Sequence, residues 1–103
     1  MVYEVVVTPD AESDMNAFLD YLFYSKQNVQ AVAALTDDFE KTLHRLAISA
    51  ASLSPDDDLK CAALGYHRIR LHRHRYFMMY RLEGQTAIVD RVFHDLQDYR
   101  NHI

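Results

Sequence analysis

The sequence predicts an α+β fold of two layers, in which a helical hairpin covers one face of a sheet. Three observations lead to this prediction. The chain opens with a β-branched run, "VYEVVVT", at residues 2–8. Two long segments follow in which apolar residues recur three and four positions apart, and the last third of the chain alternates with a period of two. The predicted order is strand, helix, helix and three strands, within a single domain at residues 1–103.

The opening strand and the first helix are predicted from the N-terminal residues. The strand at residues 2–8 is expected to be buried, because only Glu4 interrupts its apolar run. Thr8 is a suitable helix N-cap, and Pro9 suits the first helical position. The helix is predicted to continue to about residue 25, with one apolar face formed by Ala11, Met15, Phe18, Leu19 and Leu22.

A second helix is predicted between the cap residue Asn28 and the break at "SPDDD", residues 54–58. Its apolar face consists of Val32, Leu35, Phe39, Leu43, Leu46, Ala50 and Leu53. Two amphipathic helices joined by a few residues most simply form an antiparallel hairpin. We assign both apolar faces to the core and not to a partner.

The first of three C-terminal strands is predicted to have one apolar and one basic face. In "YHRIRLH", at residues 66–72, Ile69 and Leu71 alternate with Arg68 and Arg70. The apolar sides of the two helices are expected to pack against the apolar face of the sheet. Arg68 and Arg70 are therefore expected on the face that the helices leave uncovered.

Two further strands complete a three-stranded antiparallel meander. The first turn is expected within "HRHR", at residues 72–75, and the segment from Tyr76 to Leu82 is apolar on both faces, which indicates a central strand. Glu83 and Gly84 form a tight turn before the last strand, at residues 86–93. The opening strand is expected to join this sheet, since its edges would otherwise be unpaired.

Composition narrows the class of protein. With 103 residues, of which 50% are hydrophobic and 25% charged, the chain has the profile of a folded globular domain. No signal-like segment and no apolar stretch long enough for a membrane span are present, so a cytoplasmic protein without a membrane partner is expected. The single cysteine, Cys61, has no second cysteine for a disulfide, which agrees with a reducing compartment.

The two parts of the chain carry opposite net charge. Residues 1–59 contain three basic and eleven acidic groups, whereas residues 60–103 contain eight basic and four acidic groups. An anionic partner, such as a phosphate backbone or an acidic protein segment, would therefore meet the C-terminal part. Alternatively, the two parts attract each other within the fold, and the charge imbalance alone does not decide between these interpretations.

A family pattern covers most of the chain. Residues 64–99, "LGYHRIRLHRHRYFMMYRLEGQTAIVDRVFHDLQDY", combine a Gly-aromatic-x-basic-hydrophobic-basic strand, a Y-x-x-x-Y strand, an acidic-Gly turn and a strand that ends in "RVFH". This order resembles the RelE/ParE superfamily, the toxins of bacterial toxin–antitoxin and plasmid-stabilisation modules. Residues 5–22, "VVVTPDAESDMNAFLDYL", resemble the opening strand, turn and first helix of that family. The resemblance implies a small toxin that a cognate antitoxin neutralises.

The resemblance implies two alternative mechanisms. ParE-like members inhibit DNA gyrase by protein contact, whereas RelE-like members cleave messenger RNA in the ribosomal A site without a metal. Under the nuclease alternative, Arg68 and Arg70 would stabilise the charge on phosphorus, and His94 or Tyr99 would act as acid or base. The next basic position of the RelE-like pattern falls at Phe77, and a net charge of −4 does not favour RNA. The ParE-like branch is therefore favoured, and the chain is an enzyme only under the nuclease alternative.

Under the ParE-like interpretation, four arginines are the expected target contacts: Arg68, Arg70, Arg75 and Arg81. The expected partners are the antitoxin and gyrase, or the ribosome and mRNA under the alternative, with no cofactor and no direct DNA binding by the toxin alone. A non-toxic interaction module is a third alternative. His72 and His74 could share a metal, but the neighbouring arginines would repel a cation. No metal site is therefore expected, and both histidines are assigned to exposed positions.

Overall fold

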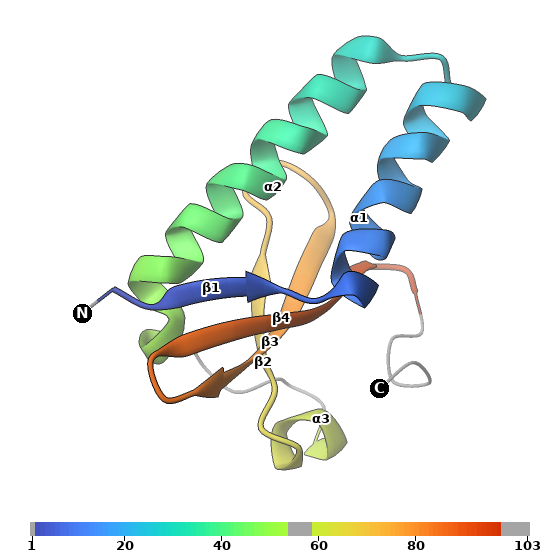
Figure 1. The fold of residues 1–103 in the computed structure, drawn as a ribbon. Coiled ribbons are helices and arrows are strands. Elements are labelled where there is room, and N and C mark those ends of the chain that lie inside the picture. The colour runs from blue at the N-terminus through green and yellow to red at the C-terminus, as the bar shows by residue number, and fades with distance from the viewer. Residues whose placement is uncertain (1, 54–58, 98–103) are drawn as a thin grey trace.

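The computed structural model describes residues 2–53 and 59–97, and it has a helical hairpin on one face of a four-stranded sheet (Figure 1). The predicted α+β class and the order of the main elements are confirmed. A short helix, α3, is the addition that the sequence did not predict. The elements are β1 (Glu4–Val7), α1 (Pro9–Asp20), the π-helical turn η1 (Tyr21–Ser25), α2 (Val29–Ser49), the 3-10 turn η2 (Ala50–Ser52), α3 (Leu59–Ala63), β2 (His67–Arg70), β3 (Tyr76–Glu83) and β4 (Thr86–His94).

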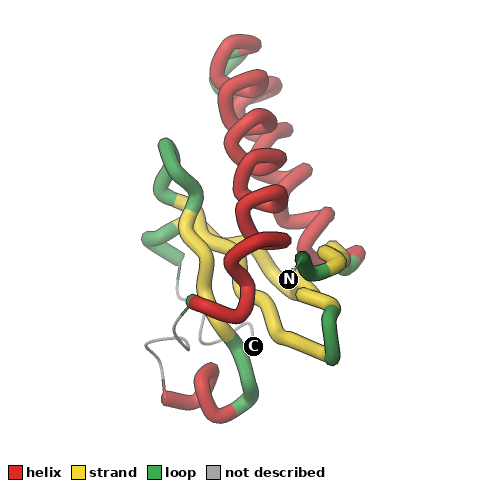
Figure 2. Tube along the Cα trace, turned by 90° about the vertical axis from the view of Figure 1, so that its left-hand side faces the viewer, coloured by secondary structure: helices red, strands yellow, loops and turns green. Residues whose placement is uncertain are grey.

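The helical hairpin begins and turns at the predicted cap residues. The side chain of Thr8 accepts a hydrogen bond from the N–H of Ala11 at 3.2 Å, and that of Asn28 accepts one from the N–H of Ala31 at 3.0 Å. Gln27 has a φ of 50°, a left-handed conformation that reverses the chain direction between the helices. Figure 2 shows the hairpin projecting well beyond the sheet. None of the helices in the described parts of the chain is long and apolar enough to cross a membrane.

The strands are arranged in the order β1-β4-β3-β2. β1 is parallel to β4, and the other neighbours are antiparallel, so β3 is an interior strand as its two apolar faces predicted. The prediction that the opening strand is buried was wrong. Glu4 and Val6 are exposed and Val5 and Val7 are only half-buried, because β1 is an edge strand with one face toward the helices.

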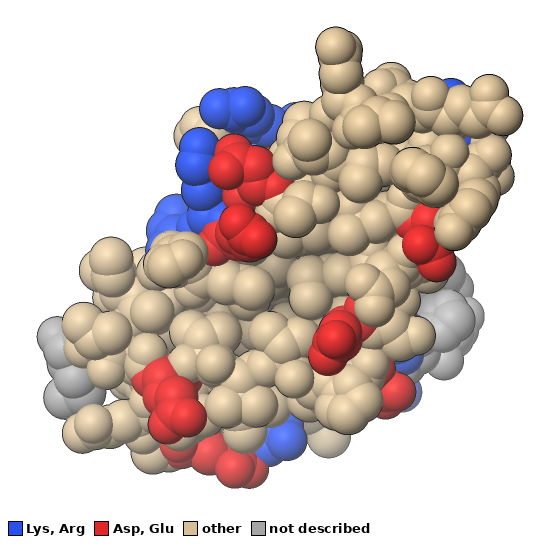
Figure 3. All heavy atoms as spheres, turned by 45° about the horizontal axis from the view of Figure 1, so that its top comes forward, with Lys and Arg blue, Asp and Glu red and all other residues tan. Residues whose placement is uncertain are grey.

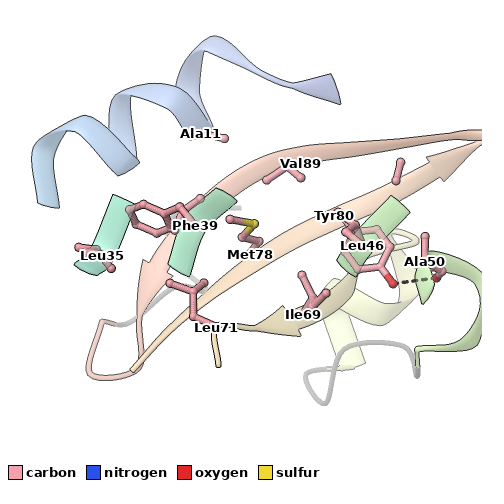
Figure 4. Packing of buried hydrophobic residues seen from close by; sticks show 12 residues of the cluster. Ala11, Leu35, Phe39, Leu46, Ala50, Ile69, Leu71, Met78, Tyr80 and Val89 are labelled. Atoms are coloured by element: carbon pink, nitrogen blue, oxygen red, sulfur yellow. Dashed lines mark hydrogen bonds between the residues drawn. The ribbon is translucent and has the colours of Figure 1, made fainter. Parts of the chain in front are cut away.

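The main core lies between the hairpin and the sheet (Figure 4). Leu35, Phe39 and Leu46 of α2 pack against Met78 and Tyr80 of β3, and all five side chains are buried. The hydroxyl of Tyr80 donates a hydrogen bond to the carbonyl of Ala50 at 2.8 Å, so the one polar atom of this buried ring is satisfied. The alternation of β3 therefore assigns Tyr76, Met78 and Tyr80 to the helix-covered face.

A smaller apolar cluster lies on the other face of the sheet. It consists of Cys61, Phe77, Met79 and Phe93, with Tyr66 packed against them. Cys61 belongs to α3, which rests on this face. The expectation that no helix covers this face was therefore wrong in part, because one short helix shields its apolar centre.

Candidate functional site

Arg68 and Arg70 project from β2 onto the face opposite the helical hairpin. Ile69, between them, is 3% exposed and belongs to the main core. Apolar and basic side chains therefore alternate between the two faces of the sheet, as predicted. The guanidinium carbon of Arg68 lies 4.1 Å from the centre of the Phe77 ring, and that of Arg70 lies 5.8 Å from it. We call Arg68, Arg70, Phe77 and Phe93 the arginine face.

Phe77 occupies the position at which the RelE-like pattern has a cation. Its side chain is 1% exposed, and its ring lies 5.8 Å from that of Phe93 on β4. A cation over an aromatic face gains about 0.5–1 kcal/mol at exposed sites. Phe77 therefore orients the guanidinium groups of Arg68 and Arg70 instead of adding a charge of its own.

Arg70 forms an ion pair with the turn that follows β4. Its Nη1 donates to Oδ1 of Asp95 at 2.9 Å, and the backbone N–H of Asp95 donates to the carbonyl of Arg75 at 2.9 Å. The guanidinium of Arg45, on α2, in turn donates to the carbonyl of Arg70. Asp95 thereby partly neutralises Arg70, whose side chain is 56% exposed.

Arg81 has two carboxylate partners. Its Nε donates to Oδ2 of Asp90 at 2.8 Å, and it also pairs with Glu83. Asp90 is the extra residue of a β-bulge, because the register shifts between Met79 and Tyr80. The hydrogen bond to Asp90 raises the pKa of Arg81 above its already high ordinary value. This arginine is therefore neutralised within the fold, although the sequence interpretation proposed it as a target contact.

Tyr66 donates to the same oxygen of Asp90, at 2.9 Å. Burial raises the pKa of Tyr66, and the hydrogen bond to the Asp90 carboxylate raises it further, so the phenol stays protonated and keeps donating. The bulge residue of β4 thereby connects Arg81 of β3 with Tyr66, the residue that precedes β2. A bulge of this kind re-aims a side chain, and nothing in the sequence pattern of β4 indicated it.

The basic loop, residues 72–75, is anchored to α2 by Asp38. This carboxylate is 3% exposed and accepts hydrogen bonds from the N–H of His72 at 3.2 Å, from the N–H of Arg73 at 2.9 Å and from Nδ1 of His74 at 2.7 Å. An ionised carboxylate only accepts, so Nδ1 of His74 carries the proton. Burial alone would raise the pKa of Asp38, but the hydrogen bonds from His74, Arg73 and His72 together lower it.

Sequence reasoning missed Asp38, and it misplaced His74. The exposed position predicted for His72 is observed, but the side chain of His74 is only 26% exposed and is held by Asp38. The signal was present in the sequence, because Asp38 lies three residues after Leu35 and four before Thr42 on the buried face of α2. A carboxylate at such a position needs internal donors.

Among the described residues, the groups of the nuclease alternative lie on two different faces of the sheet. The ring of His94 packs edge-on against Tyr76, with centroids 5.0 Å apart, and Tyr76 lies on the helix-covered face, 4.6 Å from Phe18. Arg68 and Arg70 lie on the other face. Tyr99 lies outside the described residues. Among the residues that the structure describes, no group of three side chains could hold a metal ion.

The sheet begins with a parallel N-terminal strand, its one face is covered by a helical hairpin, and its other face carries arginines of β2. This is the architecture of a toxin of the RelE/ParE superfamily. The sequence model of the family described as "ParE toxin of type II toxin-antitoxin system, parDE" matches residues 5–99. The chain belongs to this family. A search of curated proteins by sequence gave no match.

Two solved structures are similar to the chain in fold. A chain of the chromosomal ParDE toxin–antitoxin system from P. aeruginosa has a TM-score of 0.72 and 17% identity, over 90% of this chain and 96% of that chain. A chain of the toxin–antitoxin complex RelBE2 from Mycobacterium tuberculosis has a TM-score of 0.57 and 21% identity, over 91% of this chain and 99% of that chain. Because both identities are low, these likenesses establish the fold alone.

Proposed function

We propose that this protein is the toxin of a type II toxin–antitoxin module that inhibits DNA gyrase by protein contact, in the cytoplasm. The observation that carries the proposal is the match of the ParE toxin family over residues 5–99. The contact surface is the arginine face, where Phe77 orients two guanidinium groups from alternate positions of β2. Arginine is suited to protein interfaces because its planar group both stacks and forms paired hydrogen bonds with carboxylates.

Three features support protein contact over RNA cleavage. Acid–base catalysis requires the proton-transferring group within reach of the groups that stabilise the phosphate, and His94 lies on the opposite face from Arg68. Phe77 replaces a cation, and Asp95 adds a carboxylate beside Arg70. A surface that carries both cations and carboxylates suits a protein partner better than a continuous phosphate backbone.

A cognate antitoxin is the second proposed partner. The similar structures are described as a ParDE toxin–antitoxin system and a RelBE2 toxin–antitoxin complex. The basic groups of residues 60–103 favour an acidic antitoxin segment, since complementary charge increases both the rate and the specificity of association. In this proposal the antitoxin neutralises the toxin and the module stabilises the replicon that encodes it.

Two parallel assays test the proposed function. Purified protein is added to gyrase with relaxed plasmid, and separately to ribosomes programmed with messenger RNA. We expect supercoiling to be blocked and the messenger to remain intact. Ribosome-dependent cutting that Arg70→Ala abolishes would establish the nuclease alternative instead. If neither assay responds and expression is harmless to cells, the protein is a non-toxic interaction module.

A further inference from the structure

The arginines of the C-terminal part differ in whether the fold neutralises them. Several arginines bind a carboxylate within the described residues: Arg70 binds Asp95, Arg81 binds Asp90 and Glu83, and Arg91 binds Asp14. Arg73 and Arg75 in the basic loop are exposed, and neither side chain has a hydrogen bond or ion pair with the described parts of the chain. The basic loop therefore presents positive charge that no described carboxylate of the protein neutralises.

The basic loop is held in one conformation from both ends. At its start, Asp38 accepts from the backbone N–H groups of His72 and Arg73 and from the His74 ring. At its end, the carbonyl of Arg75 accepts from the N–H of Asp95. A buried carboxylate with three donors is costly to displace, because the charge would lose its partners. A loop fixed in this way presents its side chains without the entropy cost of ordering on binding.

We propose that the basic loop is a second interaction surface, which docks an acidic peptide segment of a partner protein on Arg73 and Arg75, and that Asp38 is its positioning residue. Each arginine can pair with one carboxylate of the segment through charge-assisted hydrogen bonds. The loop turns beyond the end of β2 and is anchored on α2, so this surface adjoins the arginine face without being part of it. The inference rests on the proposed function only in expecting a protein partner.

An acidic peptide fits this surface better than a nucleic acid. Glu40 is exposed and Asp37 is half-buried on the same helix as Asp38, and Asp37 pairs with Lys41 at 3.0 Å. Figure 3 shows Lys and Arg side chains gathered at one margin of the molecule directly beside acidic ones. These carboxylates would repel a continuous phosphate backbone, whereas separate peptide carboxylates can be placed between them.

The nearest aromatic residue offers no stacking platform. Tyr76 follows the loop, but its ring is in contact with Phe18 at 4.6 Å, His94 at 5.0 Å and Phe39 at 6.0 Å. Single-stranded nucleic acid gains affinity from bases that stack on exposed rings. Tyr76 therefore adds no exposed ring to the positive charge that the basic loop presents to a ligand.

The experiment compares Asp38→Asn with Asp37→Asn in the full-length protein. Both changes remove one negative charge from α2, and the side chain of Asp37 is 47% exposed and pairs with Lys41 on the same helix. Amide hydrogen exchange at His72 and Arg73 reports loop order, and titration with an oligoglutamate peptide reports anion binding. A single-stranded RNA of equal charge and the double variant Arg73→Ala/Arg75→Ala complete the set.

The direction in which peptide affinity changes distinguishes a positioning role of Asp38 from a simple effect of its charge. Loss of a negative charge by itself strengthens binding of an anionic peptide. We expect Asp38→Asn to weaken peptide binding about tenfold, and to accelerate exchange at both amides by about tenfold or more, because the loop loses its anchor. Asp37→Asn should leave exchange unchanged and bind the peptide as tightly as the wild type or more so. The double arginine variant should lose peptide binding.

Four outcomes would overturn the proposal. In the first, Asp38→Asn and Asp37→Asn behave alike in exchange and in binding. In the second, the loop amides of Asp38→Asn exchange faster while peptide affinity is unchanged. In the third, the peptide binds the double arginine variant as well as the wild type, and in the fourth, the RNA binds the wild type more tightly than the peptide does. Because neither measurement uses gyrase, a failure of the proposed function would not be mistaken for a failure of this inference.

Discussion

The guanidinium carbon of Arg68 lies 4.1 Å from the centre of the Phe77 ring, on the face of the sheet opposite the helical hairpin. An aromatic side chain thus stands where a nuclease of this superfamily is expected to have a cation, and it orients the arginine beside it. The basic segment at residues 66–82 of this acidic protein has three structural roles. Its apolar residues enter the core, Arg68 and Arg70 form the arginine face, and residues 72–75 form a loop anchored on a buried carboxylate.

The Phe77 ring is expected to matter for gyrase inhibition. Phe77→Leu keeps an apolar side chain in the smaller cluster but removes the ring under Arg68 and Arg70. Loss of about 0.5–1 kcal/mol of cation–π energy predicts that the concentration for half-inhibition of supercoiling rises about twofold to fivefold. Phe39→Leu, which removes a buried ring from the main core, is the matched control and should not change the inhibition. Equal potency of Phe77→Leu and the wild type would contradict this role.

The ion pair between Asp14 and Arg91 is expected to contribute to stability. Asp14 accepts from Nε of Arg91 at 2.7 Å and from the N–H of Val92 at 2.9 Å, and both side chains of the pair are largely buried. The pair attaches α1 to β4 beyond the end of β1. Asp14→Asn should lower the free energy of unfolding in urea by about 1–3 kcal/mol. Glu12→Gln, an exposed change on the same helix, should cost less than about 0.5 kcal/mol, and similar losses in both variants would refute the assignment.

Alkaline unfolding should depend on Tyr80. Burial raises the pKa of Tyr80 to about 12, from an ordinary value of 10.0. Because the folded-state pKa is the higher one, this contribution to stability is complete below about pH 10 and is lost as the pH rises through about 12. Tyr80→Phe should lower stability by about 1–2 kcal/mol at neutral pH, since the carbonyl of Ala50 loses its donor. The difference from the wild type should shrink between pH 10 and 12, and a constant difference would contradict the assignment.

Unfolding in acid should depend on Asp38, whose contribution to stability is lost as the pH falls and not as it rises. Its pKa is lowered from the ordinary value of 3.8, so its contribution is present above that pH and is lost as the pH falls through the folded-state pKa. The free energy of unfolding of the Asp38→Asn variant at neutral pH should therefore be about 1–3 kcal/mol lower than that of the wild type. The gap should narrow below about pH 4 when unfolding is followed by circular dichroism. A gap that stays constant down to pH 2 would show that the carboxylate is not the stabilising group.

The sequence predicted those parts of the fold that depend on periodicity. The apolar residues of α2 and the two apolar faces of β3 led directly to the hairpin and to the interior strand. Helix α3 was missed because five residues are too few to show a helical periodicity. β1 was predicted to be buried because a β-branched run alone does not distinguish an edge strand from an interior one.

Only the part of the candidate site that follows from the alternation of apolar and basic residues in β2 could be predicted. Alternation placed Arg68 and Arg70 on one face, but it could not indicate that Asp95 approaches Arg70 from the turn after β4. The bulge at Asp90 and the anchoring of the basic loop by Asp38 depend on contacts between residues far apart in the sequence. Such contacts follow from tertiary packing, which a local pattern does not contain.

The most direct test of the account is inhibition of gyrase supercoiling by Arg68→Ala/Arg70→Ala. The control is Lys26→Ala/Lys41→Ala, which removes the same charge from the helical hairpin. Both variants are first shown to be folded by circular dichroism. We predict that the double arginine variant loses inhibition by at least about tenfold, whereas the lysine variant inhibits like the wild type. Full inhibition by the arginine variant would contradict the proposal that the arginine face contacts gyrase.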